Sequence, residues 1–363
     1  MGRHPPDLEC RATPRPEEAN SGAPLATDDM RVISSSSARA SRSTTFPWRG
    51  GYWRPSWMSS VSDSSPRKGR VRQVGLLQPL LRSLETGSVY ALAALGIILV
   101  WRTSLVMHFA QGSMGMFSGT AVAFVLNRTG APLWASVLVG AAVAIALGFA
   151  VDFAVIRRLR RATAVGKEIV TLGLIMVFLG LAPILFGTEP MLLPKAIPDG
   201  ALTIGDAYLS YNGLLNICLG VAIAAGLFVM LQKTKIGLAI RATASNEQTA
   251  RLMGIPTRRV TVLAWAAAGV LGMLAAVMIA PATTVTPTFM NTVQVTALFA
   301  CVLGGFQTFY GPVLGAYLIA VAGNFLQLYV SSVWGEQLLY LLILLFLLVR
   351  PNGLVGKTYL KKV

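Results

Sequence analysis

Apolar runs of about 20 residues, separated by short polar breaks, limit the fold of this chain more than any other feature. They begin near residue 73 and continue to residue 349. A helix of that length crosses a hydrocarbon core of about 30 Å. Only 13% of the residues are charged, whereas an average soluble domain carries about 25%. The pattern excludes a soluble enzyme and predicts an all-α fold, a polytopic membrane helix bundle.

The number of predicted crossings is eight or nine. The shortest run is expected to be broken or re-entrant, which is tolerated where irregular backbone lines a cavity inside the protein. The stretch 101–112 offers an alternative, because a helix break there would add a crossing. The runs lie at about 76–100, 105–126, 133–156, 169–187, 213–231, 260–281, 291–305, 311–330 and 333–349.

The net charge of +16 indicates sidedness. Residues 1–72 carry 12 Lys/Arg and 7 Asp/Glu, and the remaining 291 residues carry 19 and 8. Most of the excess therefore lies in short loops, which the positive-inside bias predicts to be cytoplasmic. Nucleic-acid binding is excluded, because no basic, aromatic-interleaved surface lies outside the tail. The clusters are Arg157, Arg158, Arg160, Arg161 and Lys167; Lys233, Lys235, Arg241, Arg251, Arg258 and Arg259; and Arg350, Lys357, Lys361 and Lys362.

The division of the chain follows from these patterns. Residues 1–72 form a basic extension rich in Pro and Ser, which we expect to be disordered. It is an arm for anionic lipid, an interaction tail, or in part a misassigned start, with translation beginning at Met58 and residues 1–57 absent. Three crossings before the first basic cluster place the start of the chain outside, where a positive tail is awkward to translocate. A transmembrane domain at 73–356 and a cytoplasmic tail at 357–363 follow.

Small residues at helical spacing predict close helix packing. Gly140, Ala144 and Gly148 stand four residues apart, as do Gly311 and Gly315. The loop 188–212 is the longest on the predicted external side and is acidic, so it is either an ordinary connection or a rim for an extracytoplasmic partner.

The cytoplasmic loop 232–259 contains a short predicted helix, 246–253. Ser245 is a suitable N-cap, and Gln248 three residues later completes a capping box. Gly254 suits the left-handed position that ends a helix.

A helix this short is marginal in water, so we expect it to dock on a partner or to rest on the membrane surface. Ala250 and Met253 offer an apolar contact. Glu247 and Arg251, four residues apart, are placed to pair with each other or to reach a partner.

Four segments resemble the branched-chain amino-acid ABC transporter permeases, over roughly residues 75–356. They are GSVYALAALGIILVWRTSLVMHFAQG, GLAIRATASNEQTARLMGI, GGFQTFYGPVLGAYL and LLVRPNGLVG. The resemblance implies an ABC importer permease fold in the bacterial cytoplasmic (inner) membrane. It implies a second homologous permease subunit, two cytoplasmic ATPase subunits and an extracytoplasmic substrate-binding protein, with branched-chain or related amino acids as substrates and ATP used by the partner subunits.

The resemblance also implies roles for individual residues. The short helix looks like the family's coupling loop, which makes Ser245, Glu247, Ala250, Arg251 and Gly254 ATPase-coupling residues, although Gly254 follows Glu247 by seven positions instead of the usual six. His108, Gln111 and Gly112 would lie on the translocation pathway. His108 stands where the family usually has Asn, and we expect it to be a hydrogen-bonded packing residue.

Enzyme chemistry finds little support in the sequence. A phosphate-binding loop is absent, so we expect the chain not to hydrolyse ATP and to bind no cofactor. Two histidines and three scattered cysteines support no metal site. Among the membrane carboxylates, Glu85 is expected to pair with Arg82 and Asp152 with Arg157. The alternative function, an ion-coupled secondary transporter of small solutes, would require more carboxylates near the midplane than the chain has.

Overall fold

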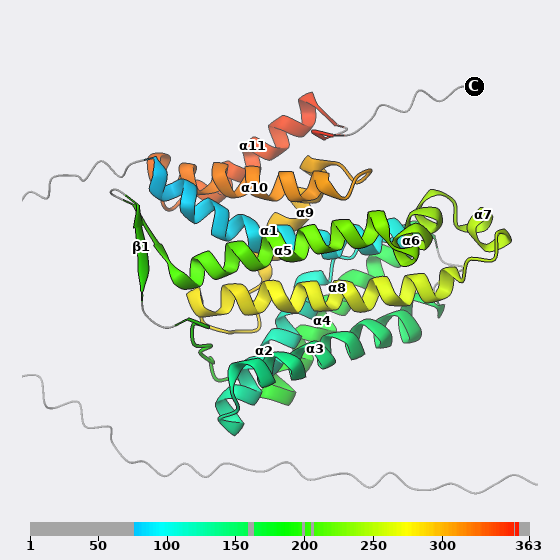
Figure 1. Cartoon of the computed structure of the whole chain (residues 1–363), viewed down its shortest axis with the longest axis horizontal. Coiled ribbons are helices and arrows are strands. Elements are labelled where there is room, and N and C mark those ends of the chain that lie inside the picture. The colour runs from blue at the N-terminus through cyan, green and yellow to red at the C-terminus, as the bar shows by residue number, and fades with distance from the viewer. Residues whose placement is uncertain (1–75, 159–162, 198–199, 205–206, 352, 356–363) are drawn as a thin grey trace, which may run out of the picture. The chain divides into compact units, whose positions relative to one another are not determined.

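The computed structural model describes residues 76–158, 163–197, 200–204, 207–351 and 353–355, all within the unit Gly69–Val363. The predictions for residues 1–72 and 357–363, and for Arg160 and Arg161, lie outside the described residues. The described part is mainly helical (Figure 1). Its helices are α1 Leu77–Ser104, α2 Gln111–Thr129, α3 Leu133–Ala150, α4 Ala164–Phe186, α5 Tyr211–Lys233, α6 Lys235–Ser245, α7 Glu247–Leu252, α8 Thr257–Ile279, α9 Asn291–Gly304, α10 Tyr310–Phe325 and α11 Gly335–Val349.

Six helical segments in the described part are long and apolar enough to cross a membrane. α9 and α11 are apolar but shorter, and α9 is a continuous helix, not a broken one. The six segments are Leu77–Ser104, Leu133–Ile156, Val165–Phe186, Tyr211–Lys233, Thr257–Ala282 and Tyr310–Val330.

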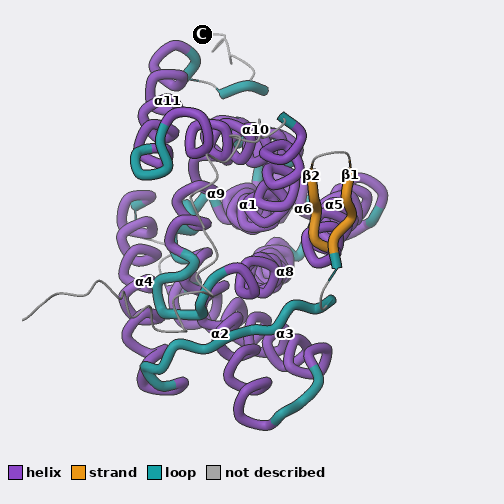
Figure 2. The backbone as a smooth tube through the Cα atoms, turned by 90° about the vertical axis from the view of Figure 1, so that its left-hand side faces the viewer, coloured by secondary structure: helices purple, strands orange, loops and turns teal. Residues whose placement is uncertain are grey.

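The centre of the bundle is α1, which packs against α5, α8, α9 and α10 (Figure 2). Its residues from Val89 to Val100 are buried or nearly so. A core helix surrounded by other helices is apolar on all sides, which explains why α1 reads as one continuous apolar run.

Small residues allow the close helix contacts that their spacing predicts. A Cβ atom added at Gly148 of α3 would lie 2.6 Å from the carbonyl oxygen of Trp265 on α8. One added at Gly315 of α10 would lie 2.5 Å from the carbonyl oxygen of Ala300 on α9. These positions accept only glycine without a shift of backbone.

A helix break separates α1 from α2, at the place where the sequence offered a break. Leu105 ends α1 in the left-handed conformation, with φ of 51°. The chain then turns back among the helices, since the Gln111 side chain at the start of α2 lies against Gly96, two turns before the end of α1. α2 therefore begins inside the bundle, and we observe no additional helix within residues 101–112.

A small β-hairpin corrects the all-α prediction. Strands β1 Ala201–Ile204 and β2 Ala207–Ser210 pair antiparallel, from Ala201 opposite Ser210 to Ile204 opposite Ala207. The Gln78 side chain at the start of α1 bonds both the backbone N–H and the carbonyl of Tyr208. The side chains of β2 alternate between buried and less buried, as expected in a strand. This pattern covers only a few residues, so it does not stand out in the sequence beside the long apolar runs.

The bundle has two ends, which Figure 1 shows at the left and right. The hairpin and the start of α1 form one, here called the hairpin end. Helices α6 and α7 form the other, here called the α7 end. Described members of two basic clusters meet there, because Arg157, Lys167, Arg251 and Arg258 line one cleft.

The two expected carboxylate pairs have different outcomes. Arg157 Nε lies 2.9 Å from Asp152 Oδ2, so that prediction is confirmed. The pairing of Glu85 with Arg82 is wrong: Glu85 accepts a hydrogen bond of 3.2 Å from the Asn216 amide, and Arg82 donates to the Tyr208 hydroxyl. Tertiary contacts with α5 and the hairpin replace the local pair that spacing alone suggested.

Candidate functional site

The segment at the α7 end is built from two short helices and not from the single one predicted. α6 spans Lys235–Ser245 and begins at Thr234, whose hydroxyl accepts a 3.1 Å hydrogen bond from the Gly237 N–H. The sequence-based prediction did not include α6. Its buried Gly237, Ile240 and Thr243, each three residues after the last, are the signal that could have identified it.

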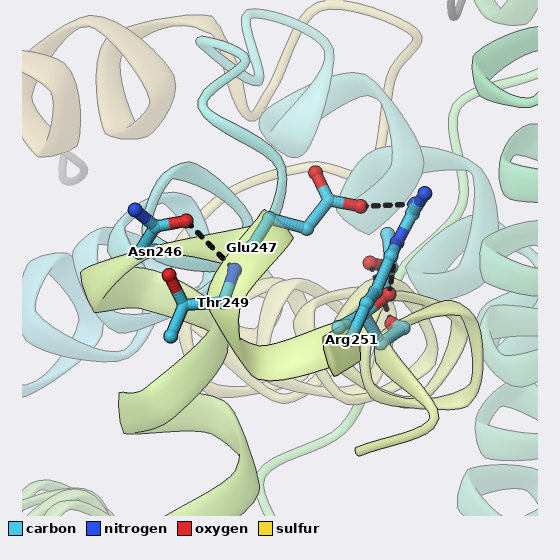
Figure 3. Close-up of polar contacts among 6 residues, drawn as sticks. Asn246, Glu247, Thr249 and Arg251 are labelled. Atoms are coloured by element: carbon cyan, nitrogen blue, oxygen red, sulfur yellow. Dashed lines mark hydrogen bonds and ion pairs between the residues drawn. The ribbon is translucent and has the colours of Figure 1, made fainter. Parts of the chain in front are cut away.

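The N-cap of α7 is Asn246, which corrects the prediction of Ser245. Ser245 is still helical and closes α6, and the chain becomes extended only at Asn246, with φ of −158° and ψ of 109°. Only the side chain at that extended position reaches the free N–H groups of the next helix. The Asn246 side chain accepts a 3.0 Å hydrogen bond from the Thr249 N–H, as Figure 3 shows.

The end of α7 agrees with the sequence prediction. Gly254 has φ of 80°, in the left-handed region that glycine occupies without strain. The observed helix, Glu247–Leu252, is two residues shorter than predicted.

Charged side chains tie α7 to the start of α8. Arg251 pairs with Glu247 across one turn of α7 (Figure 3), and its Nε donates a 2.9 Å hydrogen bond to the Thr257 hydroxyl. Thr257 is buried at the first turn of α8. Arg251 therefore fixes the short helix to a long one.

The apolar side chains of α7 point in two directions. Ala250 is buried against this chain, so it is not free to contact a partner as the sequence analysis expected. Leu252 and Met253 are 88% and 78% exposed. These two residues form the accessible apolar surface of the α7 segment.

A polar cleft of about 260 Å³ lies behind α7. It separates the short helix from the end of α1, from the π-helical segment Val151–Ile156 that continues α3, and from the starts of α4 and α8. Both carboxylates of the ion pairs described above, Asp152 and Glu247, line it together with four cationic residues.

A second candidate site surrounds the start of α2. The Gln111 amide donates a 2.7 Å hydrogen bond to the carbonyl of Ala268 on α8. The Gly112 N–H donates to Oε1 of Gln294 on α9. A helix that begins away from water needs such partners for its first N–H groups. Gln294, a polar residue inside an apolar run, was not selected in the sequence analysis.

His108 packs in the same region. Its ring is fully buried, with its centroid 4.5 Å from that of Trp265, and Trp265 donates to the Ser104 hydroxyl. Neither ring nitrogen of His108 has a hydrogen-bond partner among the described residues. It packs as expected, but none of the described residues supplies the expected hydrogen bond.

The structure thus brings His108, Gln111 and Gly112 together with Gln294. Gln111 Oε1 and Gln294 Nε2 are also buried without a partner in the described part of the chain. Buried polar atoms are rarely left unpaired, so this polar cluster, formed by these four residues, is chemically unlike the apolar interior around it. Within the described ranges, no group of three or more His, Cys, Asp or Glu is placed to hold a metal ion.

These features define a multi-pass helical membrane protein with a polar helix break in its interior and a capped short helix at one end. The family described as "Branched-chain amino acid transport system / permease component" matches residues 80–348. The chain therefore belongs to the branched-chain amino-acid ABC transporter permease family, which the sequence motifs indicated.

Two amino-acid permeases align with this chain along most of their own length, and a third relative aligns over a shorter stretch. BraD of Pseudomonas aeruginosa, a high-affinity branched-chain amino acid transport system permease protein, is 27% identical, over 79% of this chain and 98% of the relative. LivH of Escherichia coli K12, of the same description, is 26% identical over 79% and 97%. LsrC of Yersinia enterocolitica, an autoinducer 2 import system permease protein, is 33% identical over 39% of this chain and 40% of its own length.

Proposed function

We propose that this chain is the permease subunit of an ATP-driven importer for branched-chain or related amino acids. It forms part of the route through the bacterial inner membrane and crosses the membrane eight or nine times. It uses ATP through two separate ATPase subunits, binds no cofactor itself, and works with a second permease subunit and an extracytoplasmic binding protein. The near full-length match to two amino-acid permeases favours amino acids over autoinducer 2 as the substrate class.

The observation that carries the coupling role is the construction of the α7 segment. α7 has only six residues, yet it is capped by Asn246, bonded to α8 through Arg251, and exposes Leu252 and Met253. An isolated helix of this length is unstable, so the surrounding chain supplies its rigidity. A rigid attachment that presents an apolar surface is suited to receive force from an ATPase.

The polar cluster at the start of α2 is the proposed gate of the route. Unpaired amide atoms of Gln111 and Gln294 offer one acceptor and one donor to a polar group that passes. The rest of the neighbouring α1 is apolar, which suits a substrate with an apolar side chain and a polar backbone.

The test uses the exposed apolar surface of the α7 segment. Leu252→Glu combined with Met253→Glu is expected to abolish both co-purification of the co-expressed ATPase subunits and ATP-dependent leucine uptake in vesicles. Both side chains are largely exposed, so the permease itself is expected to fold and insert normally.

The matched control is Leu202→Glu in β1, an exposed leucine at the hairpin end. It should leave the ATPase bound. Continued binding of the ATPase to the double variant would refute the coupling role of α7. Leucine uptake by vesicles without any ATPase, driven by an ion gradient, would refute the importer assignment as a whole.

A further inference from the structure

A groove lined by three arginines lies near the α7 segment, between the end of α3 and the start of α8. Its volume is about 470 Å³, within the range of about 300–1,000 Å³ typical of small-molecule sites. We call it the arginine groove; its lining residues are Phe149, Arg157, Arg258, Arg259, Val262 and Leu263.

The positive charge of the arginine groove is only partly neutralised. Arg157 is paired with Asp152, but the guanidinium groups of Arg258 and Arg259 have no ion pair or hydrogen bond among the described residues. Both belong to the first turn of α8, which contains no acidic residue. The helix dipole places partial positive charge at this end of α8, so the two guanidinium groups there are unfavourable. A bound anion would interact favourably with the guanidinium groups and with the helix dipole.

The remaining wall of the groove is apolar. Phe149 and Leu263 are both nearly half exposed. On α3 and the π-helical segment Val151–Ile156 that continues it, an outward stripe of exposed Leu138, Ile145, Phe149 and Phe153 leads to Arg157. The Arg157 guanidinium lies 5.0 Å from the centre of the Phe153 ring. A continuous apolar track that ends at cationic groups matches an acyl chain attached to an anionic headgroup.

The position along the helices agrees with this chemistry. Arg157 directly follows the candidate span Leu133–Ile156, and Arg258 and Arg259 open the candidate span Thr257–Ala282. All three therefore lie where apolar spans end, at the level of lipid phosphates. Basic pockets between membrane helices on the cytoplasmic side are suited to acidic phospholipids.

We propose that the arginine groove binds an anionic phospholipid of the inner leaflet. Arg258 and Arg259, with Arg157 beside them, hold its phosphate, and an acyl chain lies along the exposed stripe of α3. The bound lipid joins the end of α3 to the start of α8, the helix to which Arg251 fixes α7. The site depends on the protein's place in a membrane but not on its substrate or on the ATPase.

The test measures phosphatidylglycerol binding to the purified full chain by native mass spectrometry, titrated from detergent micelles that contain phosphatidylcholine. Arg258→Gln combined with Arg259→Gln should weaken binding about 25-fold, because each basic residue near an anionic lipid contributes about fivefold. Arg258→Lys with Arg259→Lys should retain most of the affinity, since the charges remain. The matched control is Lys233→Gln with Lys235→Gln, which removes the same charge from exposed positions outside the groove.

Each other outcome overturns the proposal. Equal weakening in the glutamine pair and in the control pair would mean general attraction to a basic surface. Displacement of the lipid by inorganic phosphate at matched concentration would mean a site for a free anion. Unchanged lipid binding by the Arg258→Gln/Arg259→Gln variant, together with loss of ATPase subunits when the same variant is co-expressed and co-purified with them, would mean a protein-docking surface. Because the isolated chain is used, failure here leaves the importer assignment unaffected.

Discussion

The contact between α3 and α8 at Gly148 allows a quantitative prediction. In Gly148→Ala, the new Cβ would lie 2.6 Å from the Trp265 carbonyl oxygen and 2.7 Å and 2.8 Å from the Ala266 Cα and N. Ordinary contact begins at 3.4 Å, so the two backbones must separate by about 0.8 Å, the difference between the two distances. All three neighbours are backbone atoms, and no side-chain rotation relieves the overlap.

Replacing glycine by alanine at Gly180 of α4 provides the comparison, because this position has open space around it and the new Cβ meets no neighbour. Overpacking costs about 1–3 kcal/mol, and the rigid surroundings of Gly148 place it near the upper value. Replacing glycine by alanine inside a helix returns about 0.5–1 kcal/mol. We therefore expect Gly148→Ala to lower the free energy of unfolding by about 2 kcal/mol and Gly180→Ala to raise it by about 0.5–1 kcal/mol.

The stability of both variants is measured by thermal unfolding of the purified protein in detergent, with intrinsic fluorescence as the signal. Gly148→Ala should lower Tm and Gly180→Ala should leave it equal or higher. Equal shifts in the two variants would show that α3 and α8 are not in close contact at this position, and the packing argument would be wrong.

Three other predictions concern the two candidate sites. Asn246→Ala should destabilise α7 by about 1 kcal/mol through loss of its cap, whereas Ser245→Ala should not; faster hydrogen exchange in residues 247–252 of the first variant alone is the expected result. Gln294→Leu leaves the first-turn N–H of α2 buried without an acceptor and should cost about 1–3 kcal/mol in thermal unfolding; Gln294→Glu, which keeps an acceptor, should cost less. Arg251→Gln should change global stability by less than about 1 kcal/mol, because its pair with Glu247 is half exposed and its hydrogen bond to the Thr257 hydroxyl holds only the short α7; a larger loss of Tm would contradict that view.

The long apolar helices and their approximate limits could be predicted because apolar length and small-residue spacing are local properties. Gly148 and Gly315 each stand at a backbone contact that sequence spacing already indicated. The left-handed Gly254 was equally predictable, since few residues other than glycine take that conformation.

The errors arise where the answer depends on a partner distant in sequence. Ser245 and Asn246 are both good caps, and the choice depends on where α6 ends, which its packing on α1, α5 and α8 decides. Glu85 pairs with Asn216 of α5, 131 residues away, instead of its helical neighbour. Gln294 has its role only because α2 begins beside it, with Gly112 at a separation of 182 residues in the sequence. Local patterns do not contain such information.

The length of α1 has a mechanical consequence. At 28 residues and about 1.5 Å per residue it is about 42 Å long, with no proline or helix break between Leu80 and Ser104. One end is bonded to the β-hairpin through Gln78, and the other contributes Thr103 and Ser104 to the cleft behind α7. α1 is therefore a continuous helix that connects the two ends of the bundle. If α1 tilts as a rigid body, a displacement of its α7 end moves the hairpin at the far end with no bend in α1 itself.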